Sequence, residues 1–202
     1  MTIRADFALF ASLIKPHAKI LDVGCDTGDL LTYLRSEKSC DTRGIEKSSH
    51  GVKMSVKAGH SVIQGDANID LQHYPTDSFD VAILSKTIQT MQAPEETIKE
   101  ITRIGKKAIV GFSNFGHYSV LWDLLYRKKM PKTKALPLTW YGTPNIHFCT
   151  IRDFVDLCDT LNLQVEQRYI LNANGKIIKT CPRSYRAGLL GVEAVFLISQ
   201  KK

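Results

Sequence analysis

Two acidic residues and a glycine-bearing turn are the groups in this sequence best suited to chemistry. The turn reads GCDTG over residues 24–28, and Glu46 and Asp66 follow the next two strand-like runs. Glycines let the backbone approach a ligand closely, and the helix that begins there offers unpaired N–H groups. A carboxylate at Glu46 can accept hydrogen bonds from two ribose hydroxyls, and Asp66 suits the exocyclic amine of adenine. Together these groups predict an adenosine site.

A dinucleotide is the main rival ligand, and the turn fits it poorly. The dinucleotide fingerprint requires G-x-G-x-x-G, whereas the glycines here are spaced G-C-D-T-G, and no G-x-x-x-x-G-K phosphate loop is present. The acid after the third strand has a use in holding the adenine of S-adenosylmethionine (SAM) and none in the basic dinucleotide fingerprint. The pattern therefore favours SAM, or its product S-adenosylhomocysteine (SAH), as the cofactor.

The elements that must position these groups alternate between strand and helix. Strands are expected at 19–23, 42–46, 61–65, 79–85, 107–112, 164–171 and 192–199. Helices are expected in the N-terminal stretch FALFASLI and at about 28–36, 48–58, 94–103, 117–129 and 150–161. Short apolar strands that alternate with helices predict an α/β, doubly wound, mostly parallel sheet. The last two strands, connected through NANGK, predict an antiparallel edge, and we expect one domain over residues 1–202.

Two helix starts carry local signals. Pro94 is followed by two glutamates, which favour the positive end of a helix, and its missing N–H is not needed there. Thr150 stands three places before Asp153, the spacing of a capping box.

Ligands of such sheets bind beyond the carboxyl ends of the strands, so the residues that follow the first four strands should converge. The predicted cofactor contacts are Asp22, Gly24, Cys25, Asp26, Gly28, Glu46, Lys47, Gly65, Asp66, Ala67 and Ser85. Within this set, we expect Asp22 to fix the turn through backbone hydrogen bonds. We expect Cys25 to contribute its backbone rather than a reactive thiol.

The composition excludes several classes of protein. No run approaches the roughly 18 apolar residues needed to cross a bilayer, and the five cysteines are odd in number with no close pairing, which suits a reducing cytoplasm. No metal site is expected. The net charge of +7 is typical of an ordinary basic soluble protein and favours that interpretation over nucleic-acid binding.

Several longer stretches resemble one family, the methionine biosynthesis protein MetW family, whose members are class I methyltransferase-like. The stretches are ILDVGCDTGDLLTYL, VIQGDAN, SFDVAILSKTIQTM, GKKAIVGFSNFGHY and MPKTKALPLTWYGTPNIHFCTIRDF. The resemblance implies a seven-stranded Rossmann-like methyltransferase fold and a role in methionine biosynthesis. It also implies an association with homoserine O-acyltransferase (MetX), which MetW-like proteins support.

Two hypotheses for function follow, and the sequence leaves open whether the chain is an enzyme. The first is an accessory protein that binds SAM or SAH and supports homoserine O-acyltransferase. The alternative is an active SAM-dependent methyltransferase with a small-molecule substrate. The fourth strand ends in SKTIQ rather than the N-P-P-aromatic pattern, which disfavours methylation of DNA bases or glutamine.

Asp26 departs from the D/E-x-G-x-G-x-G pattern of methyltransferase-like proteins, because it replaces the middle glycine. The position can require positive φ, which Asp tolerates better than most residues. Its carboxylate would also lie near the methionine end of SAM. Facing the ammonium it would strengthen binding, and facing the carboxylate it would weaken binding by about 1–4 kcal/mol. Weak binding of SAM or SAH is our hypothesis.

The segment from about 113 to 149 is longer than an ordinary connection. Trp122, Tyr126, Trp140 and Tyr141 lie among its cations. It is predicted to act as a lid or as a surface for a partner, or else as a helix packed on the sheet. Its candidate residues are His117 and His147 for acid–base catalysis, and Asn114, Tyr141 and Asn145 for contact with a substrate or partner. Both histidines have the alternative role of bonding neighbouring backbone.

Overall fold

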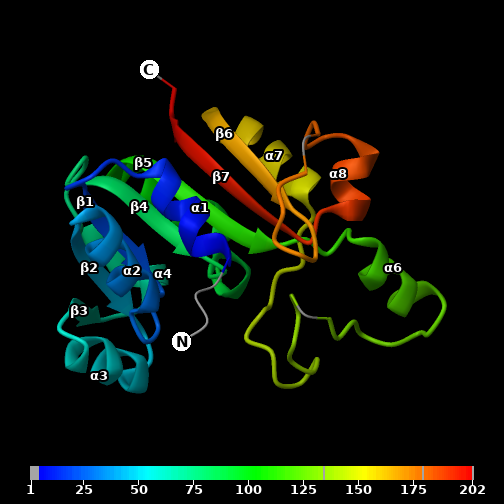
Figure 1. The fold of residues 1–202 in the computed structure, drawn as a ribbon, viewed down its shortest axis with the longest axis horizontal. Coiled ribbons are helices and arrows are strands. Elements are labelled where there is room, and N and C mark those ends of the chain that lie inside the picture. The colour runs from blue at the N-terminus through cyan, green and yellow to red at the C-terminus, as the bar shows by residue number, and fades with distance from the viewer. Residues whose placement is uncertain (1–4, 134, 179, 202) are drawn as a thin grey trace.

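A single seven-stranded sheet organises the protein, with the strand order β3-β2-β1-β4-β5-β7-β6 (Figure 1). The structure is a computed structural model that describes residues 5–133, 135–178 and 180–201. The strands are β1 Lys19–Val23, β2 Asp41–Glu46, β3 Ser61–Gln64, β4 Phe79–Ser85, β5 Gly105–Ser113, β6 Leu163–Leu171 and β7 Glu193–Gln200. The first five strands are parallel to one another, and β7 runs antiparallel between β5 and β6. The doubly wound fold and the antiparallel pairing at one edge are therefore confirmed.

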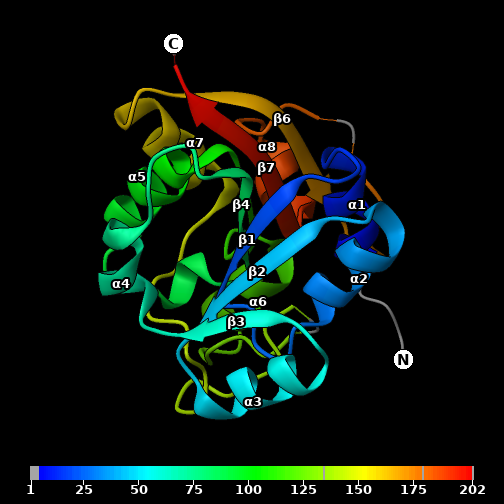
Figure 2. The same cartoon turned by 90° about the vertical axis from the view of Figure 1, so that its left-hand side faces the viewer.

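Helices cover both faces of this sheet. They are α1 Ala5–Leu13, α2 Asp29–Lys38, α3 Ser49–Lys57, α4 Ala67–Asp70, α5 Pro94–Ile104, α6 Tyr118–Leu125, α7 Ile151–Thr160 and α8 Tyr185–Leu190. Two short 3-10 turns, η1 Leu71–His73 and η2 Ile88–Thr90, follow α4 and β4. In Figure 2, α1 and α2 lie on one side of the sheet, and α5 and α7 lie on the other.

The hydrophobic core has two parts because the central strands are apolar on both faces. One cluster joins β4 and β5 to α5 and α7 through residues such as Ile98, Phe112 and Phe154. The other cluster joins the opposite face to α1 and α2 through residues such as Phe10 and Leu34. Burial of apolar surface on both faces is the main stabilising contribution in such a sheet. It holds the carboxyl ends of β1 to β5 in one row.

The helix starts agree with their local signals. Pro94 is the first residue of α5, with Glu95 and Glu96 in its first turn. Thr150 caps α7 through a complete capping box with Asp153. In the N-terminal helix, Ala8 and Ser12 face solvent while Phe7 and Phe10 are buried, as an amphipathic helix requires.

Two regions differ from the sequence prediction. The helix expected at 117–129 forms only over Tyr118–Leu125, and the chain beyond it to residue 149 is irregular in its described part. The connection between β6 and β7 contains α8, which the sequence did not predict. Ser184 caps this helix by accepting a hydrogen bond from the Ala187 N–H. No helix in the described ranges is long and apolar enough to cross a membrane.

Candidate functional site

The carboxyl ends of β1 to β4 enclose a cleft of about 390 Å³. Residues from the predicted cofactor set line it: Gly24, Glu46, Lys47, Gly65, Asp66 and Ala67. They come from the carboxyl ends of β1, β2 and β3. Because these strands pair in parallel, residues that are far apart in the sequence lie close together at one edge of the sheet. Ile45 of β2 and Asn68 of α4 also line the cleft, and the other lining residues follow β4, apart from Ile146, which comes from the 113–149 segment.

Glu46 holds the loop after β1 in place. One carboxylate oxygen accepts the Asp26 N–H at 2.9 Å, and the other accepts the Ser48 N–H at 2.7 Å. A carboxylate offers about four lone-pair positions. Two of those positions stay available to accept ribose hydroxyls from the cleft that Glu46 lines.

Asp66 lines the same cleft and is also held in position. Its Oδ1 accepts the backbone N–H of Asn68 at 3.0 Å and the side-chain amide of Asn68 at 2.7 Å. Its Oδ2 pairs with the Lys47 ammonium at 2.8 Å. The Lys47 hydrogen bond is the largest of the effects that lower the pKa of Asp66, so the carboxylate is ionised at neutral pH. An ionised acceptor is what the amine of adenine requires.

The two glycines of the turn make room for side chains of this chain. A Cβ on Gly24 would lie 2.5 Å from Thr87 Cγ2, and one on Gly28 would lie 2.8 Å from Ser55 Oγ. Both glycines have left-handed backbones, with φ of 77° and 80°. The turn is therefore packed against the loop after β4 on one side and α3 on the other.

Asp26 takes the left-handed conformation, with φ of 46°. Its side chain is exposed, while its backbone is engaged on both sides. The Asp26 N–H donates to Glu46, and its carbonyl accepts the Ser55 hydroxyl at 2.7 Å. Asp is among the few non-glycine residues that adopt this conformation readily, which explains how the loop closes without a middle glycine.

The remaining predicted contacts lie deeper. Asp22 is buried in β1, where it stands in register with Gly44 of β2 and Ile83 of β4. Cys25 is buried against Gly44. Burial, helped by the Asp22 and Glu46 carboxylates, raises the pKa of the Cys25 thiol to about 12, so it stays protonated. Ser85 is partly buried at the end of β4.

The hydrogen-bond acceptors of the cleft fit the adenosine part of SAM. The Glu46 and Asp66 carboxylates, from the ends of β2 and β3, line one cleft together with Gly65 and Ala67. The cleft volume falls within the range of about 300–1,000 Å³ that is usual for small-molecule sites.

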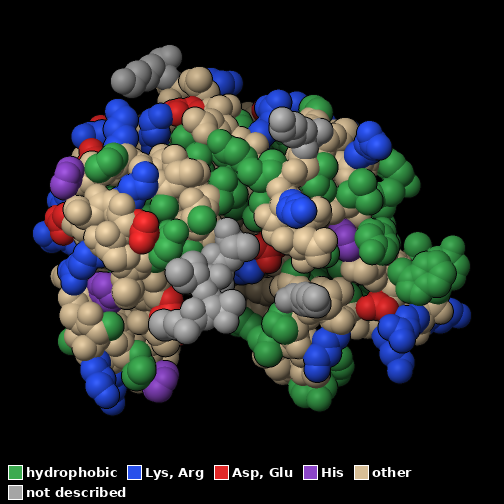
Figure 3. All heavy atoms as spheres, viewed as in Figure 1, with side chains coloured by type: hydrophobic (Ala, Val, Ile, Leu, Met, Phe, Trp, Pro, Cys, Tyr) green, Lys and Arg blue, Asp and Glu red, His purple; other side chains and the backbone are tan. Residues whose placement is uncertain are grey.

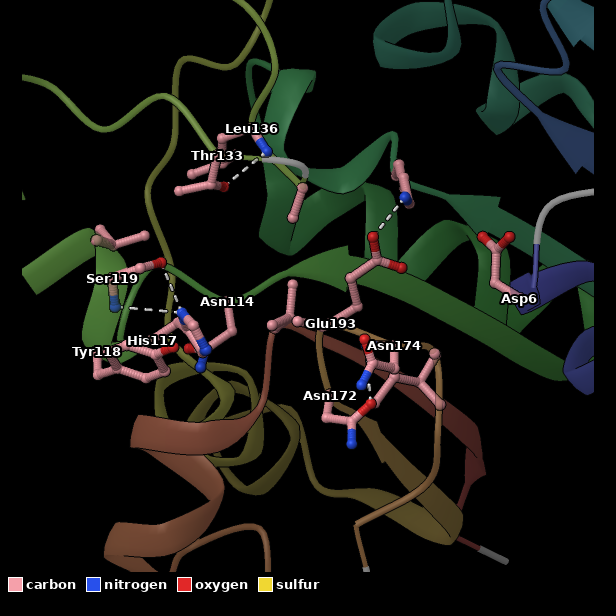
Figure 4. A pocket seen from close by; sticks show the side chains of 17 residues that line it. Asp6, Asn114, His117, Tyr118, Ser119, Thr133, Leu136, Asn172, Asn174 and Glu193 are labelled. Carbon is pink, nitrogen blue, oxygen red and sulfur yellow. Dashed lines mark hydrogen bonds and ion pairs between the residues drawn. The ribbon is translucent and has the colours of Figure 1, made fainter.

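A second cavity of about 530 Å³ opens at the same sheet edge, beyond β4 (Figure 4). Lys86 lines both cavities and connects them. Its backbone is left-handed, with φ of 61°, and its ammonium lies 2.6 Å from the Glu193 carboxylate at the start of β7. A non-glycine residue held in this conformation is frequent at functional sites. Residues after the fourth strand were expected at this edge of the sheet, but Lys86 was not among the predicted contacts.

Asn114 and His117 line the second cavity, but their polar atoms serve the fold. The Asn114 amide donates to the carbonyls of Gly188 and Gly191 and accepts the N–H groups of Gly116 and Ile151. His117 caps α6, because its Nδ1 accepts the Ser119 N–H at 3.3 Å. Nδ1 also lies 2.8 Å from the Ser119 hydroxyl. Burial lowers the pKa of His117, which favours the neutral form of its ring.

The other candidates of the 113–149 segment lie away from both cavities. Tyr141 is 77% exposed, and the His147 side chain is exposed as well. Asn145 lines a small apolar cavity of about 160 Å³ within the segment itself. The backbone N–H groups of Ile146 and His147 donate to the Gln89 carbonyl, which fastens this part of the segment beside the first cleft.

Sequence reasoning missed several residues that shape the first cleft. Asn68 links Asp66 to the Gln92 N–H, which donates to its side-chain oxygen at 2.8 Å. Thr87 fills the space over Gly24, and Ile146 reaches the cleft from far along the chain. Asn68 was visible in the stretch QGDAN, directly after Asp66 and Ala67. Contacts by Thr87 and Ile146 depend on tertiary packing and leave no local signal.

The sheet order and the carboxylates at the ends of β2 and β3 define a protein with the fold of the SAM-dependent methyltransferases. A structure titled as a SAM dependent methyltransferase from Archaeoglobus fulgidus matches with a TM-score of 0.71 at 13% identity, covering 97% of this chain and 92% of that chain. The [4+2]-cyclase SpnF matches with a TM-score of 0.67 at 13% identity, covering 97% and 80%. At such identities these likenesses show the fold alone.

The chain belongs to the methionine biosynthesis protein MetW family, whose family model matches residues 4–198. A curated relative is the bifunctional methionine biosynthesis protein MetXA/MetW of Rhodopirellula baltica, which is 28% identical over 176 residues. The match covers 83% of this chain and 28% of that protein. The chain thus spans just over a quarter of the length of this relative.

Proposed function

We propose that this protein binds SAM or SAH in the cleft between Glu46 and Asp66, and that it supports homoserine O-acyltransferase in methionine biosynthesis. Glu46 would accept the ribose hydroxyls and Asp66 the adenine amine. When bound, SAM would supply an activated methyl group. The residues of this chain would align it and exclude water, with Ile146 closing one side of the cleft.

The observation that supports the acyltransferase role is that the Rhodopirellula relative is named as a bifunctional protein. Its name joins MetXA and MetW in one bifunctional protein, and the part similar to this chain is a minor share of its length. Fusion raises the effective concentration of one module for the other, which benefits proteins that act together. Two proteins that are fused in one organism therefore commonly act together as separate chains in another. We therefore take a MetX-type acyltransferase as the partner.

The 113–149 segment is the surface that we assign to this partner. Figure 3 shows hydrophobic side chains gathered over α6, with Lys and Arg side chains beside them. The rings of Trp122 and Tyr126 contact each other in a tilted arrangement, with 4.3 Å between their centroids, although the two residues are 57% and 69% exposed. Exposed aromatic residues of this kind are typical of the central contacts of protein interfaces. The cations around them favour an acidic rim on the partner.

Co-purification tests this assignment. We expect the tagged protein to retain homoserine O-acyltransferase, and we expect the double change Trp122→Ala with Tyr126→Ala to weaken the complex at least about tenfold. Tyr185→Ala is the matched control, because Tyr185 is an 81% exposed aromatic residue on α8, outside the segment. Retention that is equal for the double variant and the control would contradict the assignment. SAH binding by each variant reports that the fold is intact.

An active methyltransferase is the second candidate function, and the second cavity favours it. This cavity adjoins the cofactor cleft at Lys86 and is large enough for a small substrate. The fold does not assign methyl transfer by itself, since a cyclase shares it. Incubation with SAM and metabolite extracts, with release of SAH as the readout, tests this candidate. SAH release that Glu46→Ala abolishes would support it, and no release above the rate without extract would remove it.

A further inference from the structure

The second cavity has a distribution of charge that selects for one class of ligand. Lys86 projects its ammonium from the loop after β4, and Glu193 projects its carboxylate from the start of β7, so the two meet inside the cavity. Their side chains are 36% and 20% exposed. Asp6 of α1 adds a second carboxylate to the same wall, as Figure 4 shows.

We propose that this cavity binds a small α-amino acid, with the ligand carboxylate on Lys86 and the ligand ammonium on Glu193. A ligand with both charges replaces the Lys86–Glu193 ion pair by two ion pairs and leaves neither of these two side chains unpaired. A ligand with only a negative charge would meet Glu193 and Asp6. A ligand with only a positive charge would compete with Lys86 for them. A zwitterion therefore satisfies the Lys86 and Glu193 charges best.

The rest of the lining fits a short side chain of mixed polarity. Leu136, Leu171 and Val192 provide apolar contact, while Thr133, Asn172 and Asn174 provide polar groups. The His117 ring, bonded through Nδ1 to the Ser119 N–H, can donate from Nε2. Asn114 contributes no ligand contact here, because its amide is bonded to four backbone groups. It is a positioning residue for the wall of the cavity.

The position of the cavity relates this ligand to the cofactor. Lys86 lines the cofactor cleft on one side and the second cavity on the other. Its left-handed backbone is held by its own N–H, which donates to the Gly111 carbonyl at 2.7 Å. An amino acid in the second cavity would therefore lie beside the cofactor. The choice of L-homoserine as a probe rests on the proposed function. The prediction of an amino acid as ligand rests on the charges of the cavity alone.

Calorimetry on the whole protein tests the proposal, with the standard L-amino acids and L-homoserine as probes. We expect at least one probe to bind with a Kd below about 10 mM, both without and with saturating SAH. For a homoserine complex, 4-hydroxybutanoate lacks the ammonium and 3-aminopropan-1-ol lacks the carboxylate. We expect each to bind at least about tenfold more weakly. The same two deletions are made on whichever amino acid binds best.

Glu193→Gln provides the second arm, because Glu193 lines only the second of the two cavities. We expect this change to weaken binding of the amino acid at least about tenfold and to leave SAH binding unchanged. Glu166→Gln is the matched control, since Glu166 of β6 pairs with Lys107 and its side chain is 22% exposed, close to the exposure of Glu193. No binding by any probe, equal binding of a singly charged analogue, or displacement by SAH would overturn the proposal. If the wild-type protein does not bind SAH at all, this result would instead contradict the proposed cofactor.

Discussion

The loops after β1, β2 and β3 and the segment 113–149 lie at the same sheet edge, yet they are held in different ways. The loops bond to one another, with Glu46 and Ser55 both holding the backbone of Asp26. The segment is held at its two ends, where Asn114 bonds the start of α7 and the Phe115 N–H donates to the Cys149 carbonyl. Between these ends it exposes aromatic side chains.

This difference matches two tasks. A small ligand needs acceptors fixed to within a fraction of an ångström, and hydrogen bonds between neighbouring loops supply that order. A protein partner needs exposed apolar surface that can adapt, and the exposed aromatic side chains of the segment supply that surface. We therefore expect changes at the fastened positions to affect stability, and changes in the loops to affect ligand affinity.

The largest expected effect is on stability, and it comes from removing the side chain that holds the start of the 113–149 segment. Asn114→Ala removes the side chain that bonds Gly188, Gly191, Gly116 and Ile151 at 2.6–3.3 Å, at a position only 2% exposed. Buried groups left without partners destabilise by about 1–3 kcal/mol each. The free energy of unfolding should fall by about 3 kcal/mol or more, as measured by urea denaturation.

Asn145→Ala is the control for that change. Asn145 lies within the segment, and its backbone N–H bonds the Thr143 hydroxyl, so we expect a loss below about 0.5 kcal/mol. An Asn114→Ala loss as small as the control would show that the segment is not fastened at this point.

The next effect tests the loops. Glu46→Ala should weaken SAH binding by about 1–3 kcal/mol, because it removes charge-assisted hydrogen bonds to the ribose and frees the Asp26 and Ser48 N–H groups. Calorimetry measures the affinity. Asp41→Ala is the control, since Asp41 is an exposed acid at the other end of β2. Unchanged SAH affinity in the Glu46 variant would place the ribose elsewhere.

Asp26 should give a smaller effect with an informative sign. Asp26→Gly preserves the left-handed backbone, whereas Asp26→Ala should destabilise by about 1 kcal/mol because alanine disfavours positive φ. We expect Asp26→Gly to tighten SAH binding up to about tenfold, since the exposed carboxylate repels the ligand carboxylate through solvent. Weaker binding would identify the ligand ammonium as the partner of Asp26.

The same contrast explains what sequence could predict. Glu46 and Asp66 were found because short apolar strands have clear ends, and parallel strands bring their ends to one edge. Lys86 and Glu193, by contrast, pair across 107 positions of sequence, and α8 forms within a connection whose pattern is short and weak.

The glycines show the limit of motif reasoning. Gly24 and Gly28 were predicted to let a ligand approach, and both have the positive φ that favours glycine. Their missing side chains leave space that Thr87 and Ser55 occupy. A spacing of glycines reports that something comes close, and only the tertiary structure identifies what it is.

The smallest expected effect concerns Asp66 and its dependence on pH. Its folded pKa lies below the ordinary value of 3.8, chiefly because of the Lys47 hydrogen bond. A lowered folded pKa contributes stability that is present above the unfolded pKa and is lost as pH falls through the folded value. The Lys47 side chain is 71% exposed, so this contribution should stay below about 1 kcal/mol.

Urea denaturation of the wild type and Asp66→Asn at several pH values measures this contribution. The two curves should differ near neutral pH, begin to approach each other near pH 3.8, and converge as pH falls through the lowered folded pKa of Asp66, where the wild-type carboxylate becomes protonated. Asp80 supplies the matched case outside the cleft, since Lys106 lowers its pKa through a hydrogen bond in the same way. If Asp66→Asn abolishes SAH binding at neutral pH while Asp80→Asn has no effect, the loops determine affinity. A difference in stability that persists at low pH would mean that Asp66 acts through its shape and its bonds to Asn68, and not through its charge.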